Sequence, residues 1–207
     1  HDTVHPELGT LEDFEAFVIH AASLGLEVAL DLALQCSPDH PWVRDHPEWF
    51  TMRADGTIAF DENPPRRNQD VYPLTFDNDQ FGLYREIRRV IRHWMTHGVR
   101  VFRVHRAHAQ PLLFWERLLA DIRKTDPEVI FLADAITAPA TIDALAMVGF
   151  HQSYTAFTQH EHPADVAAFL DEVANDTSDS MRPNLFVNTP DILPTYLQAG
   201  DVSMFKM

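Results

Sequence analysis

Short apolar segments that end at a polar residue are the chemically informative feature of this sequence. Three of them end at aspartate (Leu26–Asp31, Val129–Asp134 and Leu185–Asp191), and a fourth, Arg100–His105, ends at histidine. Helix-like segments separate most of these runs, as in repeated βα units with parallel strands. In a βα barrel the functional residues lie at the C-terminal ends of the strands. We therefore expect the three aspartates and the histidine to lie close together.

Carboxyl groups brought together in this way suit glycoside chemistry. Retaining transfer uses two carboxyl groups about 5–5.5 Å apart, one as the nucleophile and one as the acid/base. Asp31, Asp134 and Asp191 could supply them, although strand-end aspartates also commonly cap the helix that follows. His105 stands where a carboxylate would be needed. A zinc site built from His105, His108 and Asp134 is an alternative, because histidine and carboxylate are ordinary zinc ligands.

Composition narrows the class of protein. The chain has 207 residues, 45% of them hydrophobic, and a formal net charge of −15, so it can bury a core and does not suit a nucleic acid or an anionic membrane as a partner. Its single cysteine, Cys36, cannot form an intramolecular disulfide. No apolar stretch approaches the roughly 20 residues of a membrane span. We expect a cytoplasmic protein with a small-molecule ligand.

The pattern along the chain predicts the architecture. Residues 32–79 lack regular periodicity and contain six prolines among several aromatic residues, which indicates an ordered excursion. About five strands can be recognised. Repeating βα units also fit an open doubly wound sheet, but no glycine-rich phosphate loop follows any of these strands, so the nucleotide-binding version of that fold has no support. We therefore predict an α/β fold in which residues 1–207 form a catalytic portion, about five βα units, of a (β/α)₈ TIM barrel. Residues 32–79 are inserted after the first strand.

The amino-acid sequences of several segments resemble those of a known family. These segments are ALDLALQCSPDHPWVRDHPEWF, ENPPRRNQDVYPL, GVRVFRVHRAH, FLADA and FVNTPDIL. In this order they resemble the α-amylase superfamily (glycoside hydrolase family 13), and within it the bacterial maltosyltransferases of the GlgE type. That family extends α-1,4-glucans with maltosyl units from maltose 1-phosphate. The resemblance covers nearly the whole chain.

The resemblance implies roles for the strand-end residues. His105 occupies the nucleophile position, Asp134 the acid/base position, and Asp191 that of the transition-state stabiliser. The family has aspartate in place of His105, asparagine in place of Arg106 and glutamate in place of Asp134. Imidazole brings no negative charge to an oxocarbenium ion, and aspartate reaches roughly 1–1.5 Å less far than glutamate, a misplacement that costs rate. A non-catalytic protein that binds maltosides or glucans is therefore the alternative function.

Further residues and partners follow from the same resemblance. Gln35, Asp70 and the substituted Arg106 correspond to residues that contact the donor sugar. The supporting residues of the site are Asp31, Arg103 and His108. The implied partners are maltose 1-phosphate and α-1,4-glucan, and a homodimer is a further expectation. The resemblance implies no metal and no organic cofactor.

Overall fold

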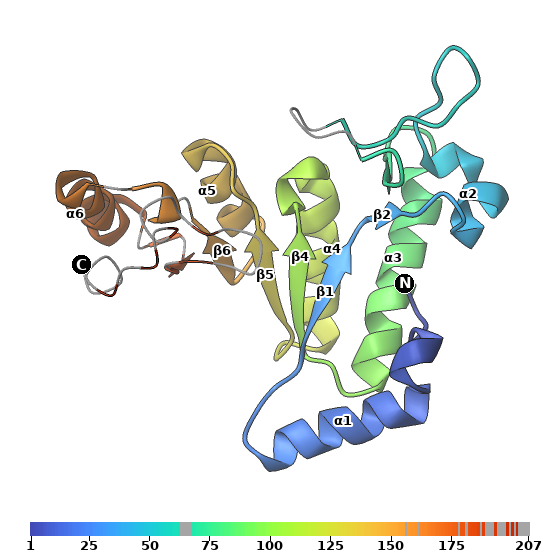
Figure 1. Cartoon of the computed structure of the whole chain (residues 1–207), viewed down its shortest axis with the longest axis horizontal. Coiled ribbons are helices and arrows are strands. Elements are labelled where there is room, and N and C mark those ends of the chain that lie inside the picture. Colours follow the sequence, from blue (N-terminus) through green and yellow to red (C-terminus); the bar gives the residue numbers. More distant parts are fainter. Residues whose placement is uncertain are drawn as a thin grey trace.

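A five-stranded parallel sheet forms the centre of the described structure (Figure 1). The computed structural model describes residues 1–62, 68–155, 157–160, 162–177, 179, 180, 182–186, 188, 193, 198, 200 and 202. The strand order is β1-β4-β5-β6-β7 and every pairing is parallel. The strands are β1 (Ala29–Ala33), β4 (Val101–His105), β5 (Ile130–Asp134), β6 (Gln152–Tyr154) and β7 (Pro183–Asn184). The predicted α/β fold with successive parallel βα units is confirmed.

Helices connect the strands, as a parallel sheet requires. The helices are α1 (Leu11–Ser23), α3 (Gln80–Thr96), α4 (Leu112–Thr125), α5 (Pro139–Met147) and α6 (Pro163–Glu172). A capping box starts α1, because the Thr10 hydroxyl accepts from the Asp13 amide and the Asp13 carboxylate accepts from the Thr10 amide. None of the helices in the described part of the chain is long and apolar enough to cross a membrane.

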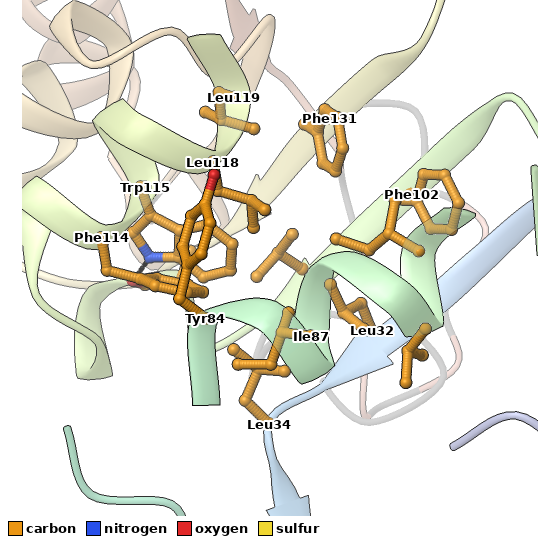
Figure 2. Close-up of a cluster of buried hydrophobic side chains, with 14 of the residues drawn as sticks. Leu32, Leu34, Tyr84, Ile87, Phe102, Phe114, Trp115, Leu118, Leu119 and Phe131 are labelled. Carbon is orange, nitrogen blue, oxygen red and sulfur yellow. Dashed lines mark hydrogen bonds between the residues drawn. The ribbon is translucent and has the colours of Figure 1, made fainter. Parts of the chain in front are cut away.

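The hydrophobic core lies between the sheet and helices α3 and α4 (Figure 2). Burial alternates along β4 and β5, so Phe102 and Phe131 face the helices and stack with 5.5 Å between ring centroids. Ile87 of α3 and Trp115 of α4 are fully buried in the same cluster. Each such side chain contributes about 1.5–3 kcal/mol through burial. The alternate residues of these strands therefore lie on the opposite face of a firmly supported sheet.

The described part of the excursion after β1 contains short elements of secondary structure. It contains β2 (Gln35–Cys36), α2 (Pro41–Asp45) and β3 (Tyr72–Pro73), and β2 pairs with β3 antiparallel. Trp49 and Phe50 are buried and join the main core. In Figure 1 this segment lies beyond the arrowhead of β1, at the C-terminal edge of the sheet.

Two predicted strands differ from the observed ones. Residues 26–28 precede β1 instead of forming it, and the strand continues two residues beyond Asp31, because pairing with β4 runs from Ala29 to Ala33. Asp31 therefore lies inside its strand. The predicted strand Leu185–Asp191 is also displaced, since β7 is Pro183–Asn184 and Leu185 lies outside it. Asp191 lies outside the described residues.

The residues directly after α6 continue as helix in spite of their polar composition. A π-helical turn, Val173–Thr177, continues directly from α6. Asn175 stabilises this continuation, because its side-chain amide donates to the Asp171 carbonyl and carboxylate four residues earlier. Local hydrogen bonding thus outweighs the polar composition of the segment.

Candidate functional site

The register of three strands brings four of the predicted site residues together. His105 of β4 lies opposite Asp134 of β5, and Arg103 of β4 lies opposite Asp31 of β1. All four positions belong to the face of the sheet turned away from α3 and α4, because burial alternates along each strand. Of the four strand-end groups expected to lie close together, the structure brings Asp31, His105 and Asp134 together around Arg103, and Asp191 lies outside the described residues.

Asp134 is the centre of this cluster. Its Oδ2 atom accepts from Arg103 Nη2 at 2.8 Å and lies 3.2 Å from His105 Nδ1. Arg103 reaches the other way with Nη1, which lies 3.1 Å from Asp31 Oδ2. The guanidinium also lies over the ring of Tyr154, 5.2 Å from its centroid. Arg103 therefore bridges Asp31 and Asp134, and Asp134 orients the imidazole of His105.

These contacts determine the charge of Asp134. Burial raises the pKa of this carboxyl, but the hydrogen bond from His105 and the charge of Arg103 together lower it below its ordinary value. The carboxyl is consequently ionised at neutral pH and holds no proton to donate. A base with so low a pKa is also weak, since acid–base catalysis works best with a pKa near the operating pH.

Arg106 is held by a residue of the excursion that sequence reasoning missed. Arg106 Nη1 donates to Asp61 Oδ1 at 2.8 Å, and Asn68 Nδ2 donates to Asp61 Oδ2 at 3.1 Å. Burial raises the pKa of Asp61, but these two hydrogen bonds lower it below its usual value. Arg106 itself has a left-handed backbone, with φ 51°, a conformation that asparagine or glycine tolerates better than arginine. No short motif links residues 61 and 106, so only the fold shows this pair.

His108 lies in the 3₁₀ turn Ala107–Ala109 that follows β4. Burial and the nearby charge of Arg106 lower the pKa of its imidazole. Its Nδ1 atom is buried and has no hydrogen-bond partner among the described residues. Within the described part of the chain, His105, His108 and Asp134 do not form a group with metal-ligand spacing, so the zinc-hydrolase alternative gains no support from the geometry.

Two of the three residues expected to contact the donor sugar, Gln35 and Asp70, line one cavity, and the third, Arg106, lies outside its lining. Its volume is about 460 Å³, and its lining includes Gln35, Asp70 and Asp31. Cys36 also borders it; this thiol is only 3% exposed, and burial raises its pKa to about 12. The aromatic residues of the excursion serve mainly in packing, because Trp49 is buried and Trp42 and Tyr72 pack against the core.

The arrangement can bind and orient a polar ligand, and its acid–base capacity is limited. His105 is 43% exposed at its side chain, and its Nε2 atom has no hydrogen-bond partner among the described residues, so it can contact a ligand. A carboxylate nucleophile is not present at this position. The described cluster therefore fits recognition better than double displacement.

Comparison with known proteins gives a consistent result over the whole chain, although no family model matches it. The whole chain aligns with the α-1,4-glucan:maltose-1-phosphate maltosyltransferase 1 of Streptomyces coelicolor at 56% identity over 207 residues. The aligned region is 31% of the length of that protein. The maltosyltransferase of Mycolicibacterium smegmatis is 55% identical and that of Mycobacterium tuberculosis 54%, with 30% and 29% of their lengths covered. The predicted resemblance to the GlgE-type maltosyltransferases is confirmed. The chain spans less than a third of the length of these relatives.

Solved structures place the fold among the α-amylases. An α-amylase from Lactobacillus plantarum superposes with a TM-score of 0.68 at 25% identity, over 84% of this chain and 45% of the amylase. A maltogenic α-amylase from Thermotoga neapolitana gives a TM-score of 0.73 at 21% identity, over 90% of this chain and 44% of that one. The sheet thus corresponds to part of the α-amylase (β/α)₈ barrel, which agrees with the predicted partial barrel.

Proposed function

We propose that residues 1–207 form the central part of a maltosyltransferase-type catalytic barrel, with residues 32–79 as its inserted excursion. This barrel binds maltose 1-phosphate and the ends of α-1,4-glucans. The site retains recognition of these sugars, while the transfer step is strongly reduced by His105 and Asp134. The single observation that carries the proposal is the 2.8 Å ion pair between Arg103 and Asp134, beside a histidine at the nucleophile position.

The binding half of the proposal rests on the cavity lined by Gln35, Asp70 and Asp31. Its volume of about 460 Å³ lies within the range of small-molecule sites, roughly 300–1,000 Å³. Neutral sugars are recognised by side chains that both accept and donate hydrogen bonds, which an amide and two carboxylates provide. The cavity is therefore suited in size and polarity to a disaccharide unit.

The proposed loss of the transfer step rests on the charges of His105 and Asp134. In double displacement a carboxylate attacks the anomeric carbon as phosphate leaves, and the acid/base then removes the proton of the incoming glucan hydroxyl. His105 offers a neutral or positive ring in place of the carboxylate. Asp134 is a weak base because Arg103 and His105 lower its pKa. Asp191, outside the described residues, is proposed to keep its role as transition-state stabiliser, and Asp31, Arg103 and His108 to support the site.

Calorimetric titration of the chain with maltose tests the binding half. We expect a weak isotherm that Gln35→Ala and Asp70→Ala each weaken about tenfold, the cost of one lost hydrogen bond to a polar ligand. Asp77→Ala, an exposed aspartate of the same excursion outside the cavity lining, is the matched control and should leave binding unchanged. Absence of heat with maltose would contradict the proposal.

Rebuilding the catalytic groups inside a complete barrel tests the proposed loss of the transfer step. The variant carries His105→Asp, Arg106→Asn and Asp134→Glu, together with Asp61→Asn, because Arg106→Asn alone would leave Asp61 buried without its cation. Release of phosphate from maltose 1-phosphate should rise on the order of 10⁴-fold, since catalytic groups that act as a unit are strongly non-additive. Asp191→Ala should then abolish the gain. Turnover by the unmodified barrel at the rebuilt rate would overturn the proposed loss of transfer.

The proposal also includes the location, the oligomeric state and the partners of the protein. A cytoplasmic location and assembly as a homodimer are expected from the family resemblance. The net charge of −15 disfavours nucleic acid and anionic membranes as partners. Sedimentation with and without added DNA distinguishes a dimer from a nucleic-acid complex.

A further inference from the structure

Three metal-ligating side chains from different segments meet at the wall of the sugar cavity. They are His1, Cys36 of β2, and His40 at the N-cap of α2, and their ligand atoms all lie within 4.8 Å of one another. In Figure 1 the N-terminal end of the chain lies beside β2. All three residues also line the cavity of about 460 Å³. In the described part of the chain this is the group with metal-ligand spacing.

The two imidazoles already have nearly the separation that a metal requires. His1 Nδ1 lies 3.1 Å from His40 Nε2. Two nitrogen ligands of a tetrahedral zinc ion, each 2.0–2.1 Å from the metal, are about 3.3 Å apart. The Cys36 sulfur lies within 4.8 Å of both nitrogens and completes the group if it moves closer by about 1 Å. The geometry is thus close to a three-ligand site.

His1 is oriented as metal-binding histidines are. Its Nε2 atom lies 2.9 Å from the Ala33 carbonyl oxygen, and its ring stacks on Trp42 with centroids 4.6 Å apart. Because a carbonyl can only accept, Nε2 carries the proton and Nδ1 presents its lone pair toward His40. An N–H donated to a backbone carbonyl is the usual outer contact of a histidine ligand.

His40 determines what metal binding must displace. Its Nδ1 atom accepts from the Trp42 amide at 3.2 Å, so the neutral ring carries its proton on Nε2 and donates it to His1. A metal takes the place of that shared proton, and the His40 proton moves to Nδ1. One capping contact of a five-residue helix is lost, and two metal–nitrogen bonds and one metal–sulfur bond replace it. At His40, metal binding therefore displaces the proton shared with His1 and this one capping contact.

We propose that His1, Cys36 and His40 bind a zinc-class divalent cation whose fourth position opens into the cavity shared with Asp31, Gln35 and Asp70. Binding forms a metal–thiolate bond at Cys36, and the thiol proton passes to solvent. Borderline-soft cations such as Zn²⁺ and Co²⁺ suit this ligand set, and Mg²⁺ does not. The cation and a maltoside compete for the cavity, a consequence that rests on the proposed function.

Titration with Co²⁺ tests the site, because cobalt–thiolate bonds absorb in the near ultraviolet. Cys36 is the single cysteine of the chain, so a thiolate-to-cobalt band can arise only there. We expect one equivalent of Co²⁺ to produce the band, Zn²⁺ to remove it by displacement, and Mg²⁺ to leave it unchanged. Absence of the band would overturn the proposal.

Variants locate the remaining ligands. His1→Gln and His40→Gln should each weaken Co²⁺ binding at least tenfold, and Cys36→Ser should remove the band while circular dichroism confirms the fold. His1→Gln changes the side chain alone, so its effect reports the imidazole. His20→Gln, an exposed histidine on α1, is the matched control. Equal affinity in His1→Gln, His40→Gln and His20→Gln would overturn the assignment.

Competition separates this proposal from the proposed function. Maltose should raise the Co²⁺ concentration needed to produce half of the band, and Co²⁺ should weaken the maltose isotherm by the same factor. A band that maltose does not affect, in a chain that binds maltose, would overturn the shared cavity. A chain that shows the band and binds no maltose would overturn the proposed function and leave the metal site established.

Discussion

The Asp134 carboxylate uses one oxygen to contact both Arg103 and His105. A carboxyl with two cationic or potentially cationic neighbours is stabilised in its charged form. An ionised carboxylate can position or bind a polar group, whereas a proton donor must be a protonated carboxylic acid. The same three side chains therefore strengthen the sheet end and weaken its acid–base chemistry.

Asp134→Asn should destabilise the protein in a pH-dependent way. The folded pKa of Asp134 lies below its ordinary value, so its ionisation stabilises the fold above about pH 4, the unfolded pKa, and this contribution disappears as the pH falls through the folded pKa. We expect a loss of about 2 kcal/mol at pH 7, shrinking below pH 4. Urea unfolding at several pH values measures it, with exposed Asp165→Asn as the control. A loss that is equal at pH 3 and pH 7 would contradict this assignment.

Cys36 should be unreactive in the folded chain. The thiolate is the nucleophile, and burial raises the pKa of this thiol to about 12 and leaves it 3% exposed. We expect iodoacetamide at pH 8 to alkylate the native chain at least tenfold more slowly than the same chain unfolded in urea, as followed by mass spectrometry. Similar rates in the two states would show that the thiol is accessible.

Among the secondary-structure elements, the excursion is joined to the end of β4 by a buried ion pair in addition to its packing against the core. Asp61 is 8% exposed and pairs with Arg106 directly after β4, whereas the neighbouring Glu62 pairs with Arg53 at an exposed position. A buried charge that loses its partner costs far more than an exposed one. Asp61 should therefore contribute more to the stability of the fold than the adjacent Glu62.

Asp61→Asn should loosen the excursion, and Glu62→Gln should not. We expect Asp61→Asn to lower the free energy of unfolding by about 2 kcal/mol and to speed limited proteolysis between residues 34 and 79. Glu62→Gln should change stability by less than about 0.5 kcal/mol. Mass spectrometry of the early fragments gives the cleavage sites. Equal cleavage in the two variants would indicate that the ion pair does not hold the excursion.

The strand ends could be predicted from the sequence more accurately than the contacts between distant segments. The predicted ends of β4 and β5, His105 and Asp134, are the observed ones, because each apolar run stops at a polar residue in the sequence. The start of β1 was predicted three residues early, since Leu26 and Val28 belong to the same run in the sequence but have no partner on β4, and pairing defines a strand. Contacts between distant segments, such as Asp61 with Arg106, leave no periodic signal. The His1–His40 pair, 39 residues apart, was missed for the same reason.

For the molecule as a whole, the five-stranded sheet has one face covered by α3 and α4 and a second that carries Asp31, Arg103, His105 and Asp134. Parallel sheets normally bury both faces. Strand β1 is the first of the sheet order, and its outer edge pairs with no strand among the described residues. Both features are typical of a barrel segment, and both expose groups that another chain can contact.

The isolated chain should therefore self-associate through the edge of β1. An unpaired edge strand is a template for pairing, and a lysine placed on it opposes that pairing. We expect the sedimentation coefficient to rise with protein concentration, and Ala29→Lys, at the start of β1, to suppress this rise. Ala54→Lys, at an exposed position of the excursion, adds the same charge and should leave association unchanged. If the chain sediments as a monomer at every concentration and melts in one sharp transition, the β1 edge is protected and association does not occur through it. If both lysine variants suppress association equally, net charge and not edge pairing governs it, because only Ala29→Lys changes the strand edge.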